Sequence, residues 1–415
     1  MRASPHALVI GGSVGGLLAA NLLARVGWRV SVFERTQGDL GDRGAAVGIT
    51  ADLLRIIQRI DPGIDAAIGV ETRSRICLDR SGTIVHEAAI RGMTSAWSRL
   101  YRPLKAALPP DCYQAGAEFR RFEQTDVSVT AHFADGSHAT GDLLVGADGL
   151  HSTVRRQLLP DVTPHYAGYV VWRVVLGERA IPPAVHAKIF HHMTFCIPDG
   201  GMVLCLPMAA AEPGGERRLQ FAWFRPADEA TLADLCTDQN GRRHGVAIPP
   251  PLIRRELIDA LAADATAHLA PEIAALLTQA PQPILQPIFD CEAPRIAFRR
   301  VALVGDAAFV ARPHVATGIT KAALDAEALA GSLCSADIDA ALTRYDAERQ
   351  PAGSRLVARG RYLGAHLEAR DGPRPERDPA QLIREYGAAG VIEDAAPGRT
   401  AGQTTQATPR CASVP

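Results

Sequence analysis

The stretch Ala-Leu-Val-Ile-Gly-Gly-Ser-Val-Gly-Gly at residues 7–16 decides the fold of this chain. Its four apolar residues predict a short buried strand, and the glycines after them predict a tight loop. Helical periodicity runs from Val14 to Val26, Gly27 ends the helix, and residues 30–33 predict a second strand. This order of strand, glycine loop, helix and strand is typical of a dinucleotide-binding α/β domain.

The residue types in this stretch indicate how it would hold a dinucleotide. Gly11 permits the tight turn, Gly16 permits close packing of helix on strand, and the helix N-terminus offers N–H groups to a pyrophosphate. Glu34 ends the second strand, where its carboxylate can accept hydrogen bonds from ribose hydroxyls. Ser13 stands where the Gly-x-Gly-x-x-Gly motif has its middle glycine. The predicted contacts in this part of the chain are Gly11, Ser13, Val14, Gly15, Gly16, Glu34, Arg35 and Arg43.

Composition excludes several classes of function. The chain has 415 residues, so two domains or one large composite domain are expected. Its net charge of -1 offers no basic field for nucleic acid. None of the eight cysteines belongs to a Cys-x-x-Cys pair, so we expect reduced thiols and no metal site. No apolar run reaches about 18 residues, so we expect no membrane helix and a cytoplasmic location.

Patterns farther along the chain indicate two structural units. Helices are predicted at 51–60 and 98–108, a hairpin at 73–86, and alternating strands at 118–142. A buried strand follows at 143–145.

The middle of the chain has a different texture. Strands are predicted at 169–172 and 219–224, and mainly helix at 253–277. A buried strand at 301–304 and a long helix from about Ile319 then return to the first unit. We predict a discontinuous nucleotide domain at 1–72, 96–164 and 288–370, a sheet-based substrate domain at 73–95 and 165–287, and a partly disordered tail at 371–415.

Two later motifs bear on which dinucleotide is bound. Gly146-Ala147-Asp148-Gly149, with Arg155 beyond it, follows one buried strand, and Gly305-Asp306-Ala307-Ala308 follows another. The second continues through Arg312-Pro313-His314 and Thr317-Gly318. Taken alone, Asp148 fits a tight turn and Asp306 a helix cap. All three motifs, in this order and each after a buried strand, argue for one shared site.

Together the motifs resemble the three fingerprints of the class A flavoprotein aromatic hydroxylases, the para-hydroxybenzoate hydroxylase type. The resemblance covers about residues 7–365, and segments 166–173 and 311–314 are similar to the branch that hydroxylates hydroxypyridines. It implies an α/β fold with a Rossmann-like FAD-binding domain, an inserted substrate sheet and C-terminal helices. It also implies that FAD is the cofactor, contacted by Asp148, Arg155, Asp306, Pro313, Gly318 and Ile319 as well. Besides Ser13, two positions depart from the family pattern: Trp97 replaces an arginine, for which Arg99 or Arg102 could substitute, and Thr320 replaces an asparagine.

The resemblance further implies a reaction. NAD(P)H reduces the flavin, O2 forms a C4a-hydroperoxide, and its distal oxygen attacks an electron-rich hydroxylated ring of the hydroxypyridine or phenol type. Activating that ring calls for a base or hydrogen-bond acceptor, a task that suits histidine. The candidates for catalysis are His314, His191, His192 and Tyr169, and Arg173 could face the same pocket. The implied partners are a small aromatic substrate and O2. We expect the protein to bind neither nucleic acid nor a membrane. Whether it forms a homodimer is left open.

Two other readings stay open at this point. The chain could be another flavoenzyme of the same fold, a halogenase, reductase or oxidase. The region at Trp172 lacks the Trp-x-Trp-x-Ile-Pro stretch of the halogenases. The second alternative, a non-catalytic flavin carrier, is supported only by the departures at Ser13 and Trp97.

Overall fold

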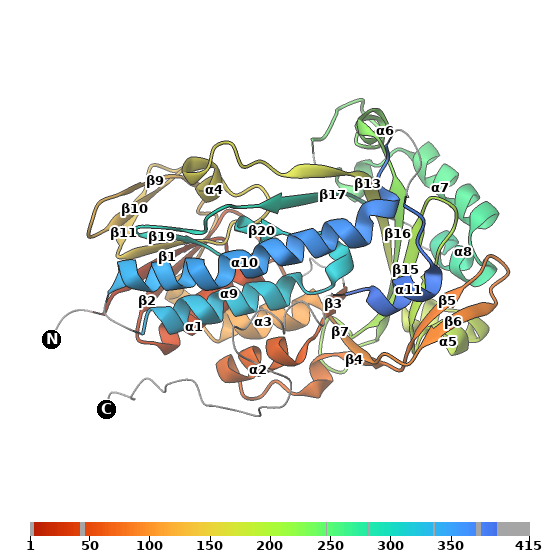
Figure 1. Cartoon of the computed structure of the whole chain (residues 1–415), viewed down its shortest axis with the longest axis horizontal. Coiled ribbons are helices and arrows are strands. Elements are labelled where there is room, and N and C mark those ends of the chain that lie inside the picture. The colour runs from red at the N-terminus through yellow and green to blue at the C-terminus, as the bar shows by residue number, and fades with distance from the viewer. Residues whose placement is uncertain are drawn as a thin grey trace.

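The opening strand, helix and second strand are present in the computed structural model of the chain (Figure 1). The structure describes residues 4–41, 46–245, 247–279, 282–334, 337–370 and 375–387. Strand β1 (His6–Ile10) leads through the glycine loop into helix α1 (Val14–Arg25), and β2 (Arg29–Glu34) pairs with β1 in parallel. Leu8 and Val9 are fully buried, as expected for the central strand of a sheet covered on both faces.

The first unit is a six-stranded sheet with the order β18-β19-β12-β1-β2-β8. Strand β1 is parallel to both β2 and β12, and β12 is parallel to β19. The remaining strands of this sheet are β8 (Tyr113–Ala115), β12 (Leu143–Gly146), β18 (Ala297–Phe298) and β19 (Val301–Leu303). Strand β19 comes after the whole middle of the chain. This sheet is therefore completed only when strands that are far apart in sequence pair with each other.

Helices and a small sheet cover the two faces of the six-stranded sheet. Helix α1 packs against α9 (Gly318–Ser332), which also contacts α10 (Ile338–Gly364), and both run lengthwise in Figure 1. Helices α2 (Ala51–Ile60) and α3 (Trp97–Ala106) also contact α1. The other face meets an antiparallel sheet and a short helix: β9 (Phe119–Gln124), β10 (Val129–Phe133), β11 (His138–Gly141) and α4 (Thr153–Leu158).

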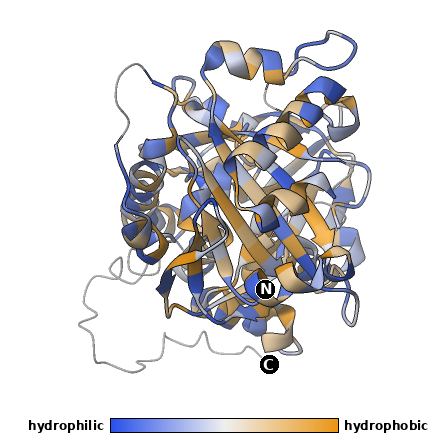
Figure 2. Cartoon of the chain, turned by 90° about the vertical axis from the view of Figure 1, so that its right-hand side faces the viewer, coloured by the Kyte–Doolittle hydropathy of each residue, from blue (hydrophilic) through white to orange (hydrophobic). Residues whose placement is uncertain are grey.

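The second unit is an eight-stranded sheet with the order β20-β17-β13-β16-β15-β14-β5-β6. Its strands are β5 (Arg75–Leu78), β6 (Ile84–Ala88), β13 (His165–Gly177), β14 (Met193–Cys196), β15 (Met202–Met208), β16 (Arg218–Pro226), β17 (Ile284–Glu292) and β20 (Phe309–Val310). Alternate residues form two apolar clusters, as the period of two in a strand requires. In Figure 2 the strands inside the molecule are largely hydrophobic, while loops at its edge are largely hydrophilic.

One face of this sheet packs on helices, and the other looks toward the first unit. The helices are α5 (Pro183–Ile189), α6 (Glu229–Leu235), α7 (Arg255–His268) and α8 (Pro271–Thr278). The opposite face, here called the inner face, holds Tyr169, Val171, Phe195, Leu204 and Phe224. The short helix α11 (Pro379–Glu385) covers part of it through Leu382 and Ile383.

Two connections join the units. Strand β17 pairs with β20, so the large sheet extends into the segment that carries the third motif. A three-stranded sheet of β3 (Ala46–Gly48), β7 (Gly92–Ala96) and β4 (Val70–Thr72) forms the second connection. The predicted α/β class, with its parallel sheet, inserted strands and C-terminal helices, is confirmed. Among the helices that the structure describes, none is long and apolar enough to cross a membrane.

Candidate functional site

The glycine loop adopts the geometry that its sequence predicted. Gly11 has a φ of 108°, and a Cβ atom there would collide with the Ala147 carbonyl of the second motif. A Cβ atom at Gly16 would collide with the Gly11 carbonyl, so this glycine lets the helix lie against the loop. Ser13 precedes α1 without capping it through its side chain, so the helix N–H groups keep their polarity for a ligand.

Glu34 lies beside this loop, at the end of β2. Its carboxylate accepts hydrogen bonds from the backbone N–H groups of Gly12 and Thr36, both at 2.9 Å. One bond to each oxygen fixes the carboxylate and leaves further lone pairs for hydroxyl donors. This geometry fits the predicted contact with a ribose.

A pocket of about 230 Å³ opens at this loop. Five predicted contacts line it: Gly11, Ser13, Glu34, Arg35 and Asp148. The pocket is also lined by Trp97, His151 and Thr153, none of which the sequence singled out as a contact. Val14 and Gly16 are buried behind it, and Gly15 faces Ala322. The predicted contact Arg43 lies outside the described residues.

Trp97 is the residue that stands where the family pattern has an arginine. It lines the pocket and stacks on Tyr101 with ring centroids 4.8 Å apart. Arg99 instead donates to the Ala67 carbonyl, and Arg102 pairs with Glu212. Neither arginine therefore takes up the position of the missing one, and an aromatic surface replaces a charge at this wall.

The second motif forms a rigid turn. Asp148 accepts hydrogen bonds from the backbone N–H groups of Thr153 (2.7 Å) and Val154 (3.2 Å) at the start of α4. Burial raises the pKa of its carboxyl, and these bonds act against that rise. Arg155 is fully buried and donates to the Ala307 carbonyl at 2.9 Å, so it ties the second motif to the third.

Asp306 differs from Asp148 because its carboxylate has no hydrogen-bond partner among the residues that the structure describes. It is solvent-accessible, yet enough protein surrounds it that desolvation raises its pKa, against the opposing charge of Lys321. The alternative that Asp306 caps a helix is therefore wrong. A carboxylate held in this way is suited to accept hydrogen bonds from sugar or ribityl hydroxyls.

The rest of the third motif turns sharply toward α9. Pro313 begins a 3-10 turn, and Ala316 after it has a φ of 55°. Helix α9 then begins at Gly318 and Ile319, with no side-chain cap on its N–H groups. A Cβ atom at Gly48 would lie 2.7 Å from the Ala316 carbonyl, so β3 approaches this turn closely. The turn thus lies between the nucleotide unit and the inner face of the large sheet.

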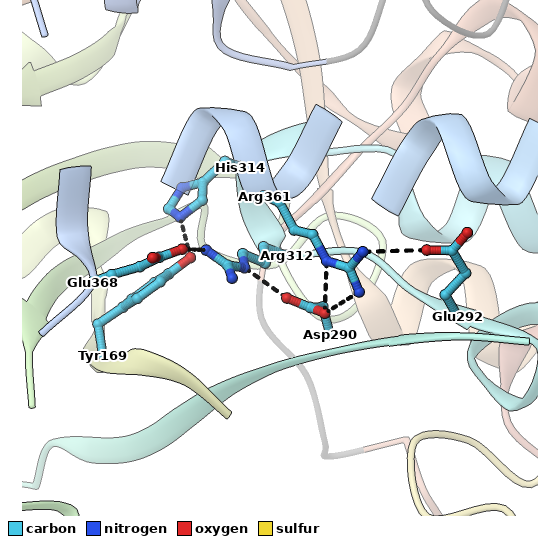
Figure 3. Close-up of polar contacts among 7 residues, drawn as sticks. All are labelled: Tyr169, Asp290, Glu292, Arg312, His314, Arg361 and Glu368. Atoms are coloured by element: carbon cyan, nitrogen blue, oxygen red, sulfur yellow. Dashed lines mark hydrogen bonds and ion pairs between the residues drawn. The ribbon is translucent and has the colours of Figure 1, made fainter. Parts of the chain in front are cut away.

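The structure brings His314 and Tyr169 together. His314 Nε2 lies 2.8 Å from the Tyr169 hydroxyl, and at most 1% of either side chain is exposed (Figure 3). Desolvation, with the nearby charge of Arg312, holds the pKa of His314 well below its usual value. Burial raises the pKa of Tyr169. Both groups are therefore neutral across the physiological range.

A buried ionic network supports this pair. Asp290 of β17 is fully buried and accepts from Arg312 Nε at 2.8 Å and from Arg361 Nη2 at 2.8 Å (Figure 3). Arg312 also reaches Glu368 at 2.5 Å. The network connects the third motif, the large sheet and α10.

His191 and His192 lie elsewhere, just before β14. His192 Nδ1 is 2.8 Å from Ser74 Oγ, which donates to Glu87 at 2.6 Å. The ring of His191 packs against His186. Strands β16 and β15 separate this group from β13, the strand of Tyr169.

These features together fit FAD. The loop admits a pyrophosphate close to its backbone, Glu34 suits a ribose, and the unpaired Asp306 suits a ribityl chain. The uncapped start of α9 offers N–H groups to an electron-rich ring system.

Comparison with known proteins agrees with this geometry. Residues 166–290 match the family described as FAD binding domain-like. The 2,6-dihydroxypyridine 3-monooxygenase of Paenarthrobacter nicotinovorans is 29% identical, over 78% of this chain and 81% of its own length. The 3-amino-4-hydroxybenzoate 2-monooxygenase of Streptomyces cremeus is 27% identical over 93% and 96%.

Solved structures extend the likeness to the fold. That of 2,6-dihydroxypyridine-3-hydroxylase from Arthrobacter nicotinovorans has a TM-score of 0.84 and 26% identity, covering 91% of this chain and 99% of that chain. The chain is thus similar, in sequence and in fold, to FAD-dependent aromatic monooxygenases of class A. Klebsiella pneumoniae HpxO, solved with FAD and uric acid, has a TM-score of 0.74 and 25% identity over 95% of this chain and 96% of that chain. FAD binding is supported by the family model and by this FAD-bound relative.

Proposed function

We propose that this protein is a class A monooxygenase that hydroxylates a hydroxylated N-heteroaromatic or phenolic ring, with NAD(P)H and O2 as co-substrates. The observation that carries the proposal is the position of the Pro313–Val315 turn. It is part of the third motif, leads into α9 of the nucleotide unit, and meets the apolar inner face of the sheet, where Phe224 reaches His314 with ring centroids 4.8 Å apart. The substrates named for the relatives, a dihydroxypyridine, an aminohydroxybenzoate and urate, are all rings of this kind.

FAD, when bound, would take electrons from NAD(P)H and activate O2, so that one oxygen atom enters the ring and the other leaves as water. The protein's own part is to orient the ring and to exclude water. The buried aromatic residues of the inner face, Tyr169, Phe195 and Phe224, suit both tasks.

His314 and Tyr169 are the catalytic candidates that this position favours. A neutral imidazole can accept or share the proton of a ring hydroxyl, and its bond to Tyr169 would fix its orientation. We assign no step to His191 or His192, because they lie beside Ser74 and Glu87 beyond two further strands.

The deciding experiment measures coupled oxygenation by the FAD-loaded enzyme. A panel of 2,6-dihydroxypyridine, 3-amino-4-hydroxybenzoate and urate is tested for stimulated NAD(P)H oxidation, O2 uptake and incorporation of isotope from labelled O2. We expect at least one ring to stimulate oxidation and to gain one labelled oxygen atom. Oxidation that yields only hydrogen peroxide with every ring would contradict a hydroxylase function.

A further inference from the structure

The inner face of the large sheet carries an arginine that pairs with nothing in the described part of the chain. Arg173 lies on β13, and its Nε is buried without a hydrogen-bond partner. Neither an ion pair nor a hydrogen bond joins its guanidinium to another described side chain. Arg173 as a whole residue is half-buried, so part of its side chain is open to a ligand.

Two other deeply placed arginines of this protein are paired with carboxylates. Arg312 pairs with Asp290 and Glu368, and Arg349 pairs with Asp325 at 3.0 Å. An unpaired, poorly hydrated guanidinium is costly, so its retention calls for a partner. Desolvation lowers the pKa of Arg173, as expected for a cation that lacks a compensating anion.

Strand register places Arg173 on the inner face. Arg173 lies opposite Ala222, Ala222 opposite Leu204, and Leu204 opposite Phe195. These four residues form one row across β13, β16, β15 and β14, with all side chains on the same face. Ala222, next to Arg173, is the smallest member of the row, so the arginine can extend across it.

Helix α11 brings a second unpaired polar group to this row. Tyr386 packs its ring on Phe195, with centroids 5.2 Å apart, and its hydroxyl has no partner among the described residues. The charges of Arg173 and Arg75 counter the rise that burial causes in the pKa of Tyr386, which places both guanidinium groups near its hydroxyl. Arg75 is already engaged, because it donates to the Ile383 and Tyr386 carbonyls at 2.9 and 2.7 Å.

The same place adjoins the third motif. Gly387 N–H donates to the His314 carbonyl at 2.8 Å, and the rings of Tyr386 and His314 are 5.9 Å apart. Arg173 and Tyr386 thus lie next to the turn that we expect to face the flavin ring.

We propose that Arg173, with the Tyr386 hydroxyl beside it, binds an anionic oxygen of the aromatic substrate, either a carboxylate or an ionised ring oxygen. This inference rests on the proposed function and narrows its substrate class to anionic rings. A guanidinium suits this role because its planar N–H groups match two oxygens of an anion. The apolar neighbours Phe195 and Leu204 would hold the ring itself.

One other arginine of this face competes for the role. Arg218, at the start of β16, also has a buried Nε without a partner. It lies opposite Met208 and Gly177 at the end of the sheet, four residues along β16 from Ala222. The test therefore includes it.

The test measures ring binding to the FAD-loaded enzyme, without NAD(P)H, by the change in flavin absorbance. The probes are 6-hydroxynicotinate for a carboxylate, urate for a ring oxyanion, and 2-hydroxypyridine as the neutral ring. Wild type is compared with Arg173→Met, Arg173→Lys and Arg218→Met. The matched control is Arg225→Met, because Arg225 lies on the opposite face of the same sheet and pairs with Asp264 at 2.7 Å.

We expect Arg173→Met to raise the Kd of an anionic probe by about 10- to 100-fold, the effect of losing a hydrogen bond to a charged group. Its Kd for 2-hydroxypyridine should stay within about twofold of wild type, and Arg173→Lys should recover part of the loss. The control Arg225→Met should bind every probe as wild type does. If Arg173→Met loses affinity for 6-hydroxynicotinate alone, the group that Arg173 binds is a carboxylate. If the variant loses affinity for urate as well, Arg173 also binds an ionised ring oxygen.

The inference would be overturned if Arg173→Met bound all three probes equally more weakly, or bound all of them as wild type does. It would also be overturned if only Arg218→Met lost the preference for anionic over neutral probes. FAD content and Tm of each variant show whether it is folded, and the lysine variant keeps the charge if the methionine variant is unstable. Failure of the proposed function would look different: no ring would stimulate NAD(P)H oxidation even in wild type.

Discussion

Two aspartates that follow buried strands are used differently in this protein. Asp148 directs its carboxylate to the start of α4, whereas no described residue hydrogen-bonds the Asp306 carboxylate. Each aspartate follows a buried strand and a nearby glycine, and this pattern does not predict the difference, because each case depends on what the chain does several residues later.

Asp306→Ala should therefore lower FAD affinity, by about 10- to 100-fold if one hydrogen bond to a charged group is lost. The measurement is FAD content after purification and the Kd for FAD by titration of the apoprotein. Asp306→Asn, which keeps the size of the side chain, should fall between alanine and wild type. Retention of full FAD content by Asp306→Ala would remove Asp306 from the cofactor site.

His314 leads to a prediction about pH. Its pKa is held well below 6.5, so a His314 that accepts the substrate proton is still neutral and active at moderately acid pH. We expect the acid limb of the kcat/KM profile to lie well below pH 6.5 and to disappear in His314→Gln. A limb near pH 6.5 that persists in this variant would place the base elsewhere.

The pKa of His366 is also lowered, and this shift makes the stability of the fold depend on pH. Burial lowers its pKa from 6.5 to about 4, so below pH 6.5 the unfolded chain takes up a proton that the folded protein refuses. Neutral His366 does not lower the free energy of unfolding above pH 6.5. As pH falls from 6.5 toward 4, the free energy of unfolding drops by about 3 kcal/mol in all, because only the unfolded chain binds the proton. His366→Gln should lose less of its unfolding free energy between pH 7 and pH 4.5 than wild type, as urea titrations would measure. The exposed His165 provides a control, and an equal effect of His165→Gln would contradict the assignment.

At the scale of elements, local patterns predicted most of the nucleotide unit. The periodicity of α1 and the apolar runs of β1, β12 and β19 are carried by consecutive residues, so they are visible in sequence. The pairing of β17 with β20 is not, because it joins segments through tertiary contact. Helix α11 was not predicted, although Asp378 followed by Pro379 is a usable helix-start signal.

The candidate site followed the same division. Glu34 and Asp306 could be proposed from sequence because their motifs are local. Trp97 was found to line the pocket only in the structure, since a tryptophan at that position carries no fingerprint. His191 and His192 were selected for their chemistry, but sequence gave no indication of the strands that separate them from Tyr169.

The link from β17 to the third motif depends on one buried carboxylate. Asp290→Asn keeps the shape of Asp290 but leaves Arg312 without its fully buried partner. We expect a loss of about 3–5 kcal/mol of unfolding free energy in urea titrations, the usual effect of breaking a buried pair. The exposed pair Arg255–Asp259 is the control, and Asp259→Asn should change stability by less than about 0.5 kcal/mol. Similar losses in both variants would show that burial does not set the effect.

For the molecule as a whole, the proposed FAD contacts come from three distant segments. Gly11, Asp148 and Asp306 come from loops that follow β1, β12 and β19. A ligand that contacts all three binds only the folded chain, so it must stabilise the fold.

FAD at about 100 times its Kd should therefore add about 2.7 kcal/mol of stability. Calorimetry of apoprotein with and without FAD should show a higher Tm that rises with FAD concentration. Asp306→Ala should reduce the shift at equal FAD concentration. A Tm independent of FAD concentration would show that the flavin does not couple these segments.

The late position of β19 has a consequence for synthesis on the ribosome. Strands β1, β2 and β12 emerge first, but their neighbour β19 follows only after the whole inserted sheet. The nascent chain must therefore carry an unpaired edge of β12 for more than 150 residues of elongation, counted from Gly146 to Val301. An exposed strand edge invites aggregation, so this interval is when a chaperone would matter most to the protein. Helix α11 emerges later still, so a nascent chain can complete its flavin pocket before it can close its inner face.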